Sequence, residues 1–308
     1  MPLNLIFMGT PNFAVPILKA IQDSHHNILE VYTQPPNKKD RGQKISLSAV
    51  HKFCNEVNLK VSHPDKLDEE IEKINKLNPD IVIVVAYGKI LPKKLLEIKK
   101  TKFINIHASL LPRWRGAAPI QRAIMNLDKE TGISIMKIEP KLDSGPIMMS
   151  SKIKIFKSTN YDNLSNQLSV LGAEMILKSL DLIEKKLEKF IPQNESKATY
   201  AKKINKTETK IDWSQKAKII IAQINGLYPN PGSWFEFNGI RIKPVKAIEI
   251  EISGKPGQII DDKFTIGCSE NSIQILELQR EGKQKMKAEE FLKGSNLKAG
   301  MNILFRNV

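Results

Sequence analysis

The sequence predicts an α/β protein in which a doubly wound, mostly parallel sheet precedes a small C-terminal β-barrel. An apolar run at residues 3–8 ends in Gly9-Thr10-Pro11 and is followed by apolar residues at helical spacing, as in a strand, turn and helix. Residues 81–86 form an unbroken, largely β-branched run, which is typical of a central parallel strand buried on both faces. Beyond residue 233 the apolar runs become short, which favours a small barrel.

The turn after the first strand bears on the ligand of this sheet. It contains a single glycine, Gly9, so the GxGxxG fingerprint of dinucleotide-binding proteins is missing. The sequence therefore predicts a Rossmann-like sheet that does not bind a nicotinamide cofactor, and a dinucleotide oxidoreductase is disfavoured.

The elements between these landmarks follow from the same periodicities. In the first part of the chain we expect strands at 28–32, 103–107, 132–138 and 147–156, and helices at 13–21, 47–57, 68–77, 119–126 and 160–187. In the last part we expect helices at 217–226 and 288–292, and short strands at 233–237, 241–250, 257–260, 265–268 and 272–278.

The length and charge of the chain bound its organisation and its partners. With 308 residues we predict a catalytic domain at 1–189, a linker at 190–205 where the apolar pattern fails, and a C-terminal domain at 206–308. The net charge of +15 favours a polyanionic partner such as nucleic acid. An overall bias toward Lys, Ile and Asn explains the charge equally well, so the charge alone leaves the question open.

Cysteine usage and the N-terminus indicate the compartment. Cys54 and Cys268 are far apart and form no CxxC or Cys/His cluster, which argues against a disulfide scaffold and against a structural metal site. The chain starts directly with an apolar strand, without a basic region or a long apolar segment. We therefore expect a cytoplasmic, monomeric enzyme that holds no metal.

A polar segment at residues 33–48 follows the second strand. It is too broken by proline and charge to predict a regular element, and it is longer than the usual connection in such sheets. Its four basic residues could bind phosphates; they are Lys38, Lys39, Arg41 and Lys44. A solvated loop without function is an equally good interpretation.

The strand expected at 103–107 carries the strongest signal for chemistry. Asn105 and His107 are two residues apart, so their side chains lie on one side of the strand while Ile104 and Ile106 lie on the other. The strand runs into a loop rich in Pro, Gly and Arg, and open α/β sheets bind ligands at such strand ends.

Asp143, in a tight loop further along the chain, completes a candidate catalytic set. Histidine can transfer a proton near neutral pH, a neighbouring carboxylate can fix its tautomer, and an asparagine amide can donate to a developing oxyanion. No Ser or Cys nucleophile with its own signature accompanies them, so attack by an external nucleophile is the more natural chemistry. Singly, Asn-x-His is more often a structural pair and Asp-Ser-Gly more often an Asx-turn.

These residues belong to longer motifs. Residues 105–112 (Asn-Ile-His-Ala-Ser-Leu-Leu-Pro), with Asp143 in a Leu-Asp-Ser-Gly loop, resemble the signature of the formyltetrahydrofolate-dependent formyltransferases. Residues 113–121 (Arg-Trp-Arg-Gly-Ala-Ala-Pro-Ile-Gln) are similar to the members of that family that act on methionyl-tRNA. The likeness covers essentially the whole chain, with small departures at Asn12, Ser144 and Pro146.

The resemblance implies a reaction, a site and a partner. The formyl group of 10-formyltetrahydrofolate would pass to the α-amino group of methionine on initiator tRNA, with Asn105, His107 and Asp143 as catalytic residues. The folate site would be lined by Tyr87, Gly88, Lys89, Ser109, Leu110, Leu111 and Pro112. The loop with Arg41 would contact the acceptor end of the tRNA, and the C-terminal domain would be an OB-like barrel that binds its body.

Two further interpretations compete with this one. A formyltransferase of the same fold could act on a small amine, such as a purine precursor or a nucleotide sugar, although such a substrate needs neither the basic loop nor a basic barrel. A tRNA-binding module with an inactive enzyme domain is also conceivable, but the complete set of Asn105, His107 and Asp143 counts against it.

Overall fold

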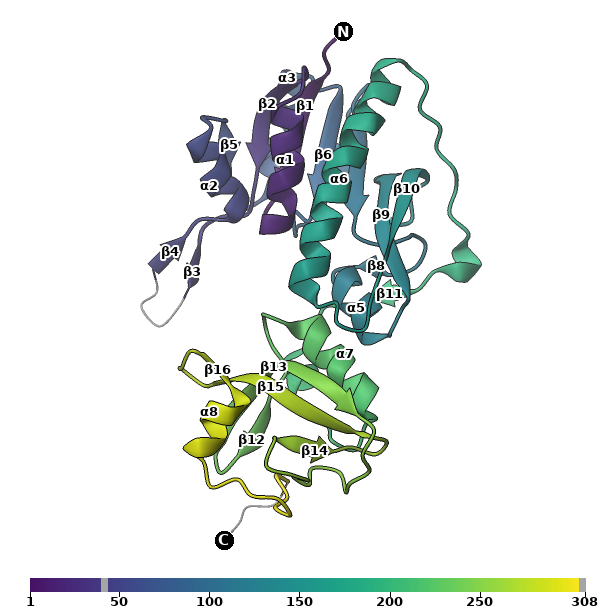
Figure 1. Ribbon diagram of the computed structural model, residues 1–308. Helices are drawn as coiled ribbons and strands as arrows, with labels where there is room; N and C mark the ends of the chain where they lie inside the picture. Colours follow the sequence, from purple (N-terminus) through teal and green to yellow (C-terminus); the bar gives the residue numbers. More distant parts are fainter. Residues whose placement is uncertain (40–43, 305–308) are drawn as a thin grey trace. The chain divides into compact units, whose positions relative to one another are not determined.

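The computed structural model describes residues 1–39 and 44–304, without the side chains of residues 37–39, 44 and 45. The chain divides into two compact units (Figure 1). Unit 1 contains residues Met1–Gly116, Thr131–Ile153 and Ser165–Ala201, and unit 2 contains Ala117–Glu130, Lys154–Leu164 and the chain from Lys202 onward. The two units are described separately.

Unit 1 is built on a seven-stranded sheet with the order β10-β9-β7-β6-β1-β2-β5. The strands are β1 (Asn4–Gly9), β2 (Asn27–Tyr32), β5 (Val61–Ser62), β6 (Ile81–Val85), β7 (Lys102–His107), β9 (Glu130–Lys137) and β10 (Ile147–Lys154). The first five of these pair in parallel, whereas β9 runs antiparallel to β7. The sheet is therefore mixed, with a parallel Rossmann-like part, as the sequence predicted.

Helices cover both faces of this sheet. The α-helices of the unit are α1 (Val15–Gln22), α2 (Ala49–Glu56), α3 (Ile71–Leu77), α4 (Lys93–Leu96) and most of α6 (Tyr161–Glu184). On one face α6 lies beside α1 (Figure 1), and Gly172 allows its backbone to approach Ile17 and Ile106 closely. On the other face Ile74 of α3 and Leu95 of α4 pack with Phe103. Strand β6 is fully buried between the two layers, as its β-branched run predicted.

The polar segment at residues 33–48 contains regular structure, which the sequence interpretation missed. Strands β3 (Asn37–Lys39) and β4 (Lys44–Ser46) pair antiparallel. At the base of this hairpin the hydroxyls of Thr33 and Ser48 are 2.7 Å apart, and Ser48 also caps α2 by accepting the backbone N–H of His51. Pairing of the backbone groups requires no apolar pattern, so the polar composition concealed these strands.

Unit 2 contains a second sheet, with the order β12-β13-β15-β14 and with β16 on β15. Its strands are β12 (Phe235–Phe237), β13 (Ile240–Ile250), β14 (Thr265–Gly267), β15 (Ser272–Arg280) and β16 (Lys285–Lys287), and its helices are α5 (Pro119–Met125), α7 (Ala217–Leu227) and α8 (Ala288–Lys293). The predicted C-terminal sheet is confirmed. A closed barrel is not, because the pairings described for these strands do not form a ring.

Residues 105–121 are here called the central motif. Helix α5, which begins at the end of this motif, packs within unit 2. A Cβ atom at Gly226 of α7 would lie 2.7 Å from Met125 and 3.2 Å from the carbonyl oxygen of Gln121, so the two helices touch closely. Arg122 of α5 forms a forked ion pair with Glu208. No helix in the described part of the chain is long and apolar enough to cross a bilayer.

Candidate active site

The central motif lies where the sequence predicted it, at the carboxyl end of β7. Asn105 pairs with Val84 of the parallel strand β6 and with Met136 of the antiparallel strand β9, and His107 pairs with Ser134 of β9. The flanking Ile104 and Ile106 are buried, so β7 presents its two polar residues on one face and its apolar residues on the other.

His107 is held in one tautomer. Its Nε2 lies 2.9 Å from the carbonyl oxygen of Trp114, and a carbonyl can only accept, so Nε2 carries the hydrogen. In the neutral ring Nδ1 therefore has a free electron pair, and this atom lies 3.7 Å from Oδ2 of Asp143. The side chain is only 7% exposed, so the arrangement is largely shielded from bulk water.

Asp143 is fixed from its own side of the pair. The backbone N–H of Gly116 donates to Oδ2 of Asp143 over 2.7 Å. The backbone of Asp143 is left-handed, with φ of 45°, a conformation that an aspartate tolerates only at a cost. In this left-handed conformation the carboxylate of Asp143 faces His107.

Asn105 supplies the third polar group. Its side chain is partly exposed, and the amide forms no hydrogen bond with another residue of the described chain. An amide without a partner beside a buried imidazole and a carboxylate can donate to an oxygen that becomes negatively charged. The end of β7 therefore combines a proton acceptor, a carboxylate and a neutral donor, which is the equipment for acyl-type transfer to an amine.

The segment Ala86-Tyr87-Gly88-Lys89 leaves the end of β6, next to β7. Ala86 and Gly88 are exposed and have positive φ angles of 46° and 82°, and the carbonyl of Tyr87 between them accepts hydrogen bonds from the side chains of Thr10 and Gln34. The Tyr87 side chain is buried, and burial raises the pKa of its hydroxyl to about 12. Lys89 donates to the carbonyl oxygens of Pro64 and Asp65, each over 2.7 Å.

Hydrogen bonds to neighbouring segments hold the loop after β7 in place. Ser109 is fully buried and its hydroxyl donates to the carbonyl of Arg113. The N–H of Leu111 donates to Ser134, and the carbonyl of Pro112 accepts the N–H of Thr199. Leu110 is half-buried. At most of these positions a ligand would therefore contact backbone rather than side-chain atoms.

The basic residues of the hairpin remain beyond structural description. Lys38, Lys39 and Lys44 lie in β3 and β4, but their side chains are outside the described part of the chain, and so is all of Arg41.

Sequence reasoning missed the residues that support the site. Arg115 is completely buried, and its guanidinium donates to the side chains of Gln193 and Glu195. Hydrogen bonds from Arg115 and from Lys141 lower the pKa of Glu195 to about 2. An arginine inside a motif of small and apolar residues was the available signal, since a buried guanidinium needs a carboxylate partner.

The other histidines lie elsewhere in unit 1. His25 and His63 are exposed, whereas His26 is buried and its Nδ1 accepts the backbone N–H of Leu3. His25, His26 and Glu184 are close enough to suggest a metal site. The hydrogen bond from Leu3 leaves His26 with its proton on Nε2, which disfavours metal binding there.

Comparisons with known proteins agree with this geometry. The family models "Formyl transferase" and "Formyl transferase, C-terminal domain" match residues 3–180 and 203–296. The methionyl-tRNA formyltransferase of Pelagibacter ubique (strain HTCC1062) is 48% identical, covering 98% of this chain and 99% of its own. That of Brucella abortus (strain S19) is 42% identical, covering 96% and 99%.

Solved structures share the fold. An N-formyltransferase from Helicobacter canadensis, in complex with folinic acid and dTDP-3-aminofucose, superposes with a TM-score of 0.67 at 22% identity, covering 93% of this chain and 100% of its own. HypX from Aquifex aeolicus, in complex with tetrahydrofolic acid, gives 0.67 at 17% identity; 99% of this chain matches about half of HypX (50%).

The two matching family models define the chain as a formyl transferase. The chain belongs to this family and, within it, to the family of the methionyl-tRNA formyltransferases.

Proposed function

We propose that the protein transfers the formyl group of 10-formyltetrahydrofolate to the free α-amino group of methionine on initiator tRNA, giving formylmethionyl-tRNA for translation initiation. The observation that carries the proposal is the set at the end of β7, where Nδ1 of His107 faces Asp143 and the amide of Asn105 has no partner among the described residues. Relatives of this name match nearly the full length of the chain.

His107 and Asp143 manage the proton of the amine. Transfer forms the bond between the amine nitrogen and the formyl carbon and breaks the bond between that carbon and N10 of the folate. An amine attacks only as the neutral base and must lose a proton once the new bond forms, and the departing N10 must take one up. With Nε2 committed to the Trp114 carbonyl, Nδ1 is the ring atom that accepts the proton of the amine. The carboxylate of Asp143 then stabilises the imidazolium, and a water that contacts both groups connects them across the 3.7 Å between Nδ1 and Oδ2.

Asn105 stabilises negative charge on the formyl oxygen. Its amide donates a hydrogen bond without any change of its own charge, and protonated His107 adds a second favourable interaction. Because both side chains project from adjacent same-side positions of β7, their spacing is set by the strand rather than by a mobile loop.

The residues at the ends of β6 and β7 fit a folate. The exposed residues Ala86 and Gly88 could lie against a flat heterocycle. Tyr87, Gly88 and Lys89 would contribute mainly backbone atoms, as would Ser109, Leu110, Leu111 and Pro112. The bound cofactor supplies the formyl group, and the protein supplies position and electrostatics.

The tRNA would be bound by two basic regions. Lys38, Lys39, Arg41 and Lys44 of the hairpin would contact its acceptor end, where arginine can bind a phosphate or a base edge with two hydrogen bonds. In unit 2, Trp234 carries the guanidinium of Arg241 at 3.9 Å from its ring centre and the amine of Lys210 at 5.7 Å, a combination suited to nucleic acid. Affinity should therefore fall as salt rises.

We extend the proposal to the organisation of the chain. Residues 1–189 would form the catalytic domain, 190–205 the connection, and 206–308 an OB-like domain that holds the tRNA body. The protein would act as a monomer in the cytoplasm, where translation begins.

The test is formyl transfer from 10-formyltetrahydrofolate to methionine charged on initiator tRNA, with charged elongator tRNA as the control. Transfer to the initiator alone supports the whole proposal. If folate binds without transfer to tRNA, a small amine such as an amino sugar nucleotide becomes the better substrate. Failure to bind folate would refute a folate-dependent reaction.

A further inference from the structure

Residues 191–201, here called the strap, lie against the catalytic loops of unit 1. The strap runs from beyond α6 past β10 to β11 (Tyr200–Ala201), which lies beside β8 (Arg115–Gly116) in Figure 1. At its start, the backbone groups of Ile191 and Ile147 exchange two hydrogen bonds of 2.8 Å. Its end pairs in parallel with the central motif, so both ends are anchored.

Gln193 connects the strap to the loop of Asp143. Its side-chain NH₂ donates to the carbonyl oxygen of Asp143 over 2.8 Å and to that of Gly145 over 2.7 Å. Its side-chain oxygen accepts two hydrogen bonds from Arg115, over 2.8 and 3.1 Å. The amide thus uses its full capacity of two donors and two acceptor sites, which also fixes its orientation.

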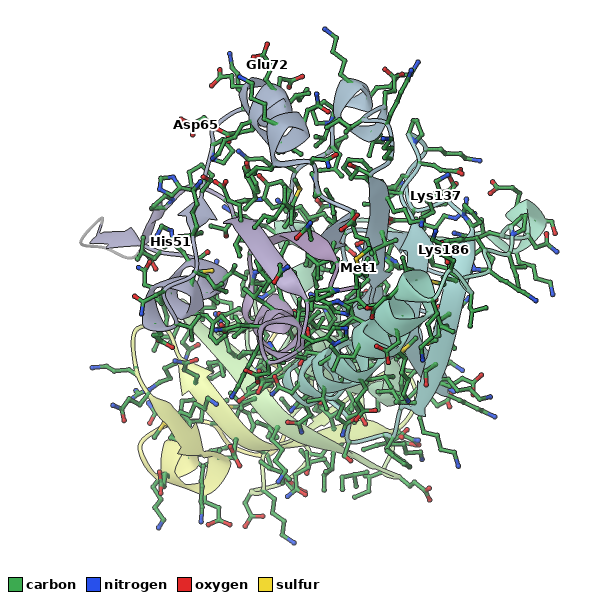
Figure 2. All side chains as sticks on the ribbon, turned by 90° about the horizontal axis from the view of Figure 1, so that it is seen from above. Met1, His51, Asp65, Glu72, Lys137 and Lys186 are labelled. Carbon is green, nitrogen blue, oxygen red and sulfur yellow. The ribbon has the colours of Figure 1, made fainter. Side chains whose placement is uncertain are left out.

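The loop that Gln193 holds has little freedom of its own. The backbone of Asp143 is in the left-handed region, and a Cβ atom at Gly145 would lie 1.9 Å from the carbonyl oxygen of Lys137. Figure 2 labels the residue Lys137. A strained residue between such close contacts keeps its geometry only if the surroundings hold it there. The hydrogen bonds from Gln193 act on the backbone of Asp143 itself.

The other end of the strap acts on His107. The hydroxyl oxygen of Thr199 accepts the N–H of Trp114 over 2.9 Å, and the carbonyl of Thr199 accepts the N–H of Arg115 over 2.9 Å. Trp114 is the residue whose carbonyl orients the His107 ring. Both members of the catalytic pair are therefore fixed through the strap.

We infer that Gln193, alone among the side chains of the strap that contact the loop of Asp143 in the described chain, is the positioning residue for Asp143; the inference rests on the proposed function. Gln193 contacts no reacting atom in this scheme. It acts by holding the peptide from which the Asp143 carboxylate projects toward Nδ1 of His107. Loss of this hold should slow the chemical step without weakening the binding of either substrate.

Two substitutions at Gln193 separate positioning from simple structural support. Gln193→Glu keeps an acceptor for Arg115 but loses both donors to the loop, whereas Gln193→Met loses both sets of hydrogen bonds. We expect each variant to lower kcat by about 10- to 100-fold, as small misplacements of catalytic groups do, with KM for charged tRNA changed less than about twofold. If Gln193 served only as a partner of Arg115, Gln193→Glu would retain wild-type kcat, and that result would overturn the inference.

The matched control is Asn194→Ala. Asn194 is the neighbour of Gln193 and is exposed, and its side-chain oxygen accepts from the N–H and the hydroxyl of Ser196. It should leave kcat unchanged, and a loss equal to that of Gln193→Glu would show that any disturbance of the strap suffices, against the specific role of Gln193.

A readout independent of activity separates this inference from the proposed reaction. The N–H of Gly116 donates to Oδ2 of Asp143, so its hydrogen exchange reports whether the carboxylate is in place. We expect protection of this amide to be lost in Gln193→Glu and kept in Asn194→Ala. Unchanged protection in both would refute the positioning role even if the wild-type protein formylated tRNA; an inactive wild type with the expected exchange would refute only the reaction.

Discussion

The interiors of the two units differ in the kind of group they bury. Within the described residues, the core of unit 2 consists of apolar and aromatic side chains, and its buried polar residues are all hydroxyls: Thr209, Ser233, Thr265 and Ser272. Unit 1 buries ionisable groups as well, among them Glu30, His107 and Arg115. Burying a charge costs several kcal/mol unless it is paired.

This difference indicates where each unit performs its role. A unit with an apolar interior stabilises a surface, and the groups proposed to bind tRNA, Lys210 and Arg241, are exposed on it. A unit that keeps charges inside retains electrostatic interactions strengthened by a low dielectric, which catalysis uses. The comparison predicts that substitutions of the polar groups at the end of β7 change chemistry, and that substitutions in the core of unit 2 change stability.

The largest effect should follow from removing a member of the catalytic pair. We expect His107→Ala and Asp143→Ala each to lower kcat by about 10²- to 10⁴-fold, because each removes a group that handles the proton of the amine. Single-turnover formyl transfer measures the rate, and filter binding measures tRNA affinity, which should be retained. A loss of affinity as large as the loss of rate would contradict the separation of roles.

The core of unit 2 should respond in stability alone. Phe264 is fully buried between Phe235, at 6.4 Å between ring centroids, and Phe291, at 5.6 Å. Phe264→Ala should lower the free energy of unfolding by roughly 3–5 kcal/mol, through lost apolar burial and the cavity that remains. Denaturant unfolding measures this free energy. The control is Ile248→Ala in β13, where the side chain is 40% exposed and the free energy of unfolding should change little. Equal effects of the two variants would contradict a tightly packed core.

Arg41, between β3 and β4 in the sequence, should act on substrate use rather than on chemistry. Arg41→Ala should lower kcat/KM for charged tRNA by about 10- to 100-fold, since a bidentate arginine contact is worth about 1–3 kcal/mol. Folate binding, measured by calorimetry, should not change. If kcat/KM with tRNA were unaltered, the hairpin would be a solvated connection without a binding role.

The smallest effect concerns a buried charge of unit 1 away from the catalytic pair. Burial alone would raise the pKa of Glu30, but hydrogen bonds from Lys73 and Ser62, with the charges of Lys73 and Lys60, outweigh it and lower the pKa. A depressed pKa stabilises the fold above the unfolded-state value near 4.5, and this contribution is lost as pH falls through the folded-state value.

Glu30→Gln tests this dependence. At pH 7 it should cost about 1–3 kcal/mol of unfolding free energy, and the difference from wild type should shrink as the pH is lowered toward 3. The control is Glu97→Gln, which removes an exposed pair with Lys93 at 3.8 Å and should have almost no effect. A difference that stayed constant with pH would show that the Glu30 charge is not the stabilising feature.

Much of the fold could be predicted because local patterns determine it. The β-branched run of β6 predicted a strand buried on both faces, and alternation in β7 placed Asn105 and His107 on one side. The long amphipathic stretch predicted α6 to within a few residues. Each of these features depends on a periodicity that a single segment carries by itself.

The supporting part of the site could not be predicted, because it depends on contacts between distant segments. No local sequence pattern marks the groups that support the site. These groups are the Trp114 carbonyl that selects the His107 tautomer, the N–H of Gly116 and the side chain of Gln193. The strap has a polar, proline-containing sequence that resembles a connection. The β3–β4 hairpin was missed for a similar reason, since it is held by backbone pairing without an apolar face.

The burial of Arg115 has a consequence for synthesis of the chain. Its carboxylate partner, Glu195, is added 80 residues later, after every strand of the catalytic sheet has been made. Until Gln193 and Glu195 have been made, the guanidinium lacks these partners, and the loops that carry His107 and Asp143 lack the hydrogen bonds from the strap. The active site can therefore form only late in translation, and a fragment that ends with α6 would contain the catalytic side chains without the means to hold them together.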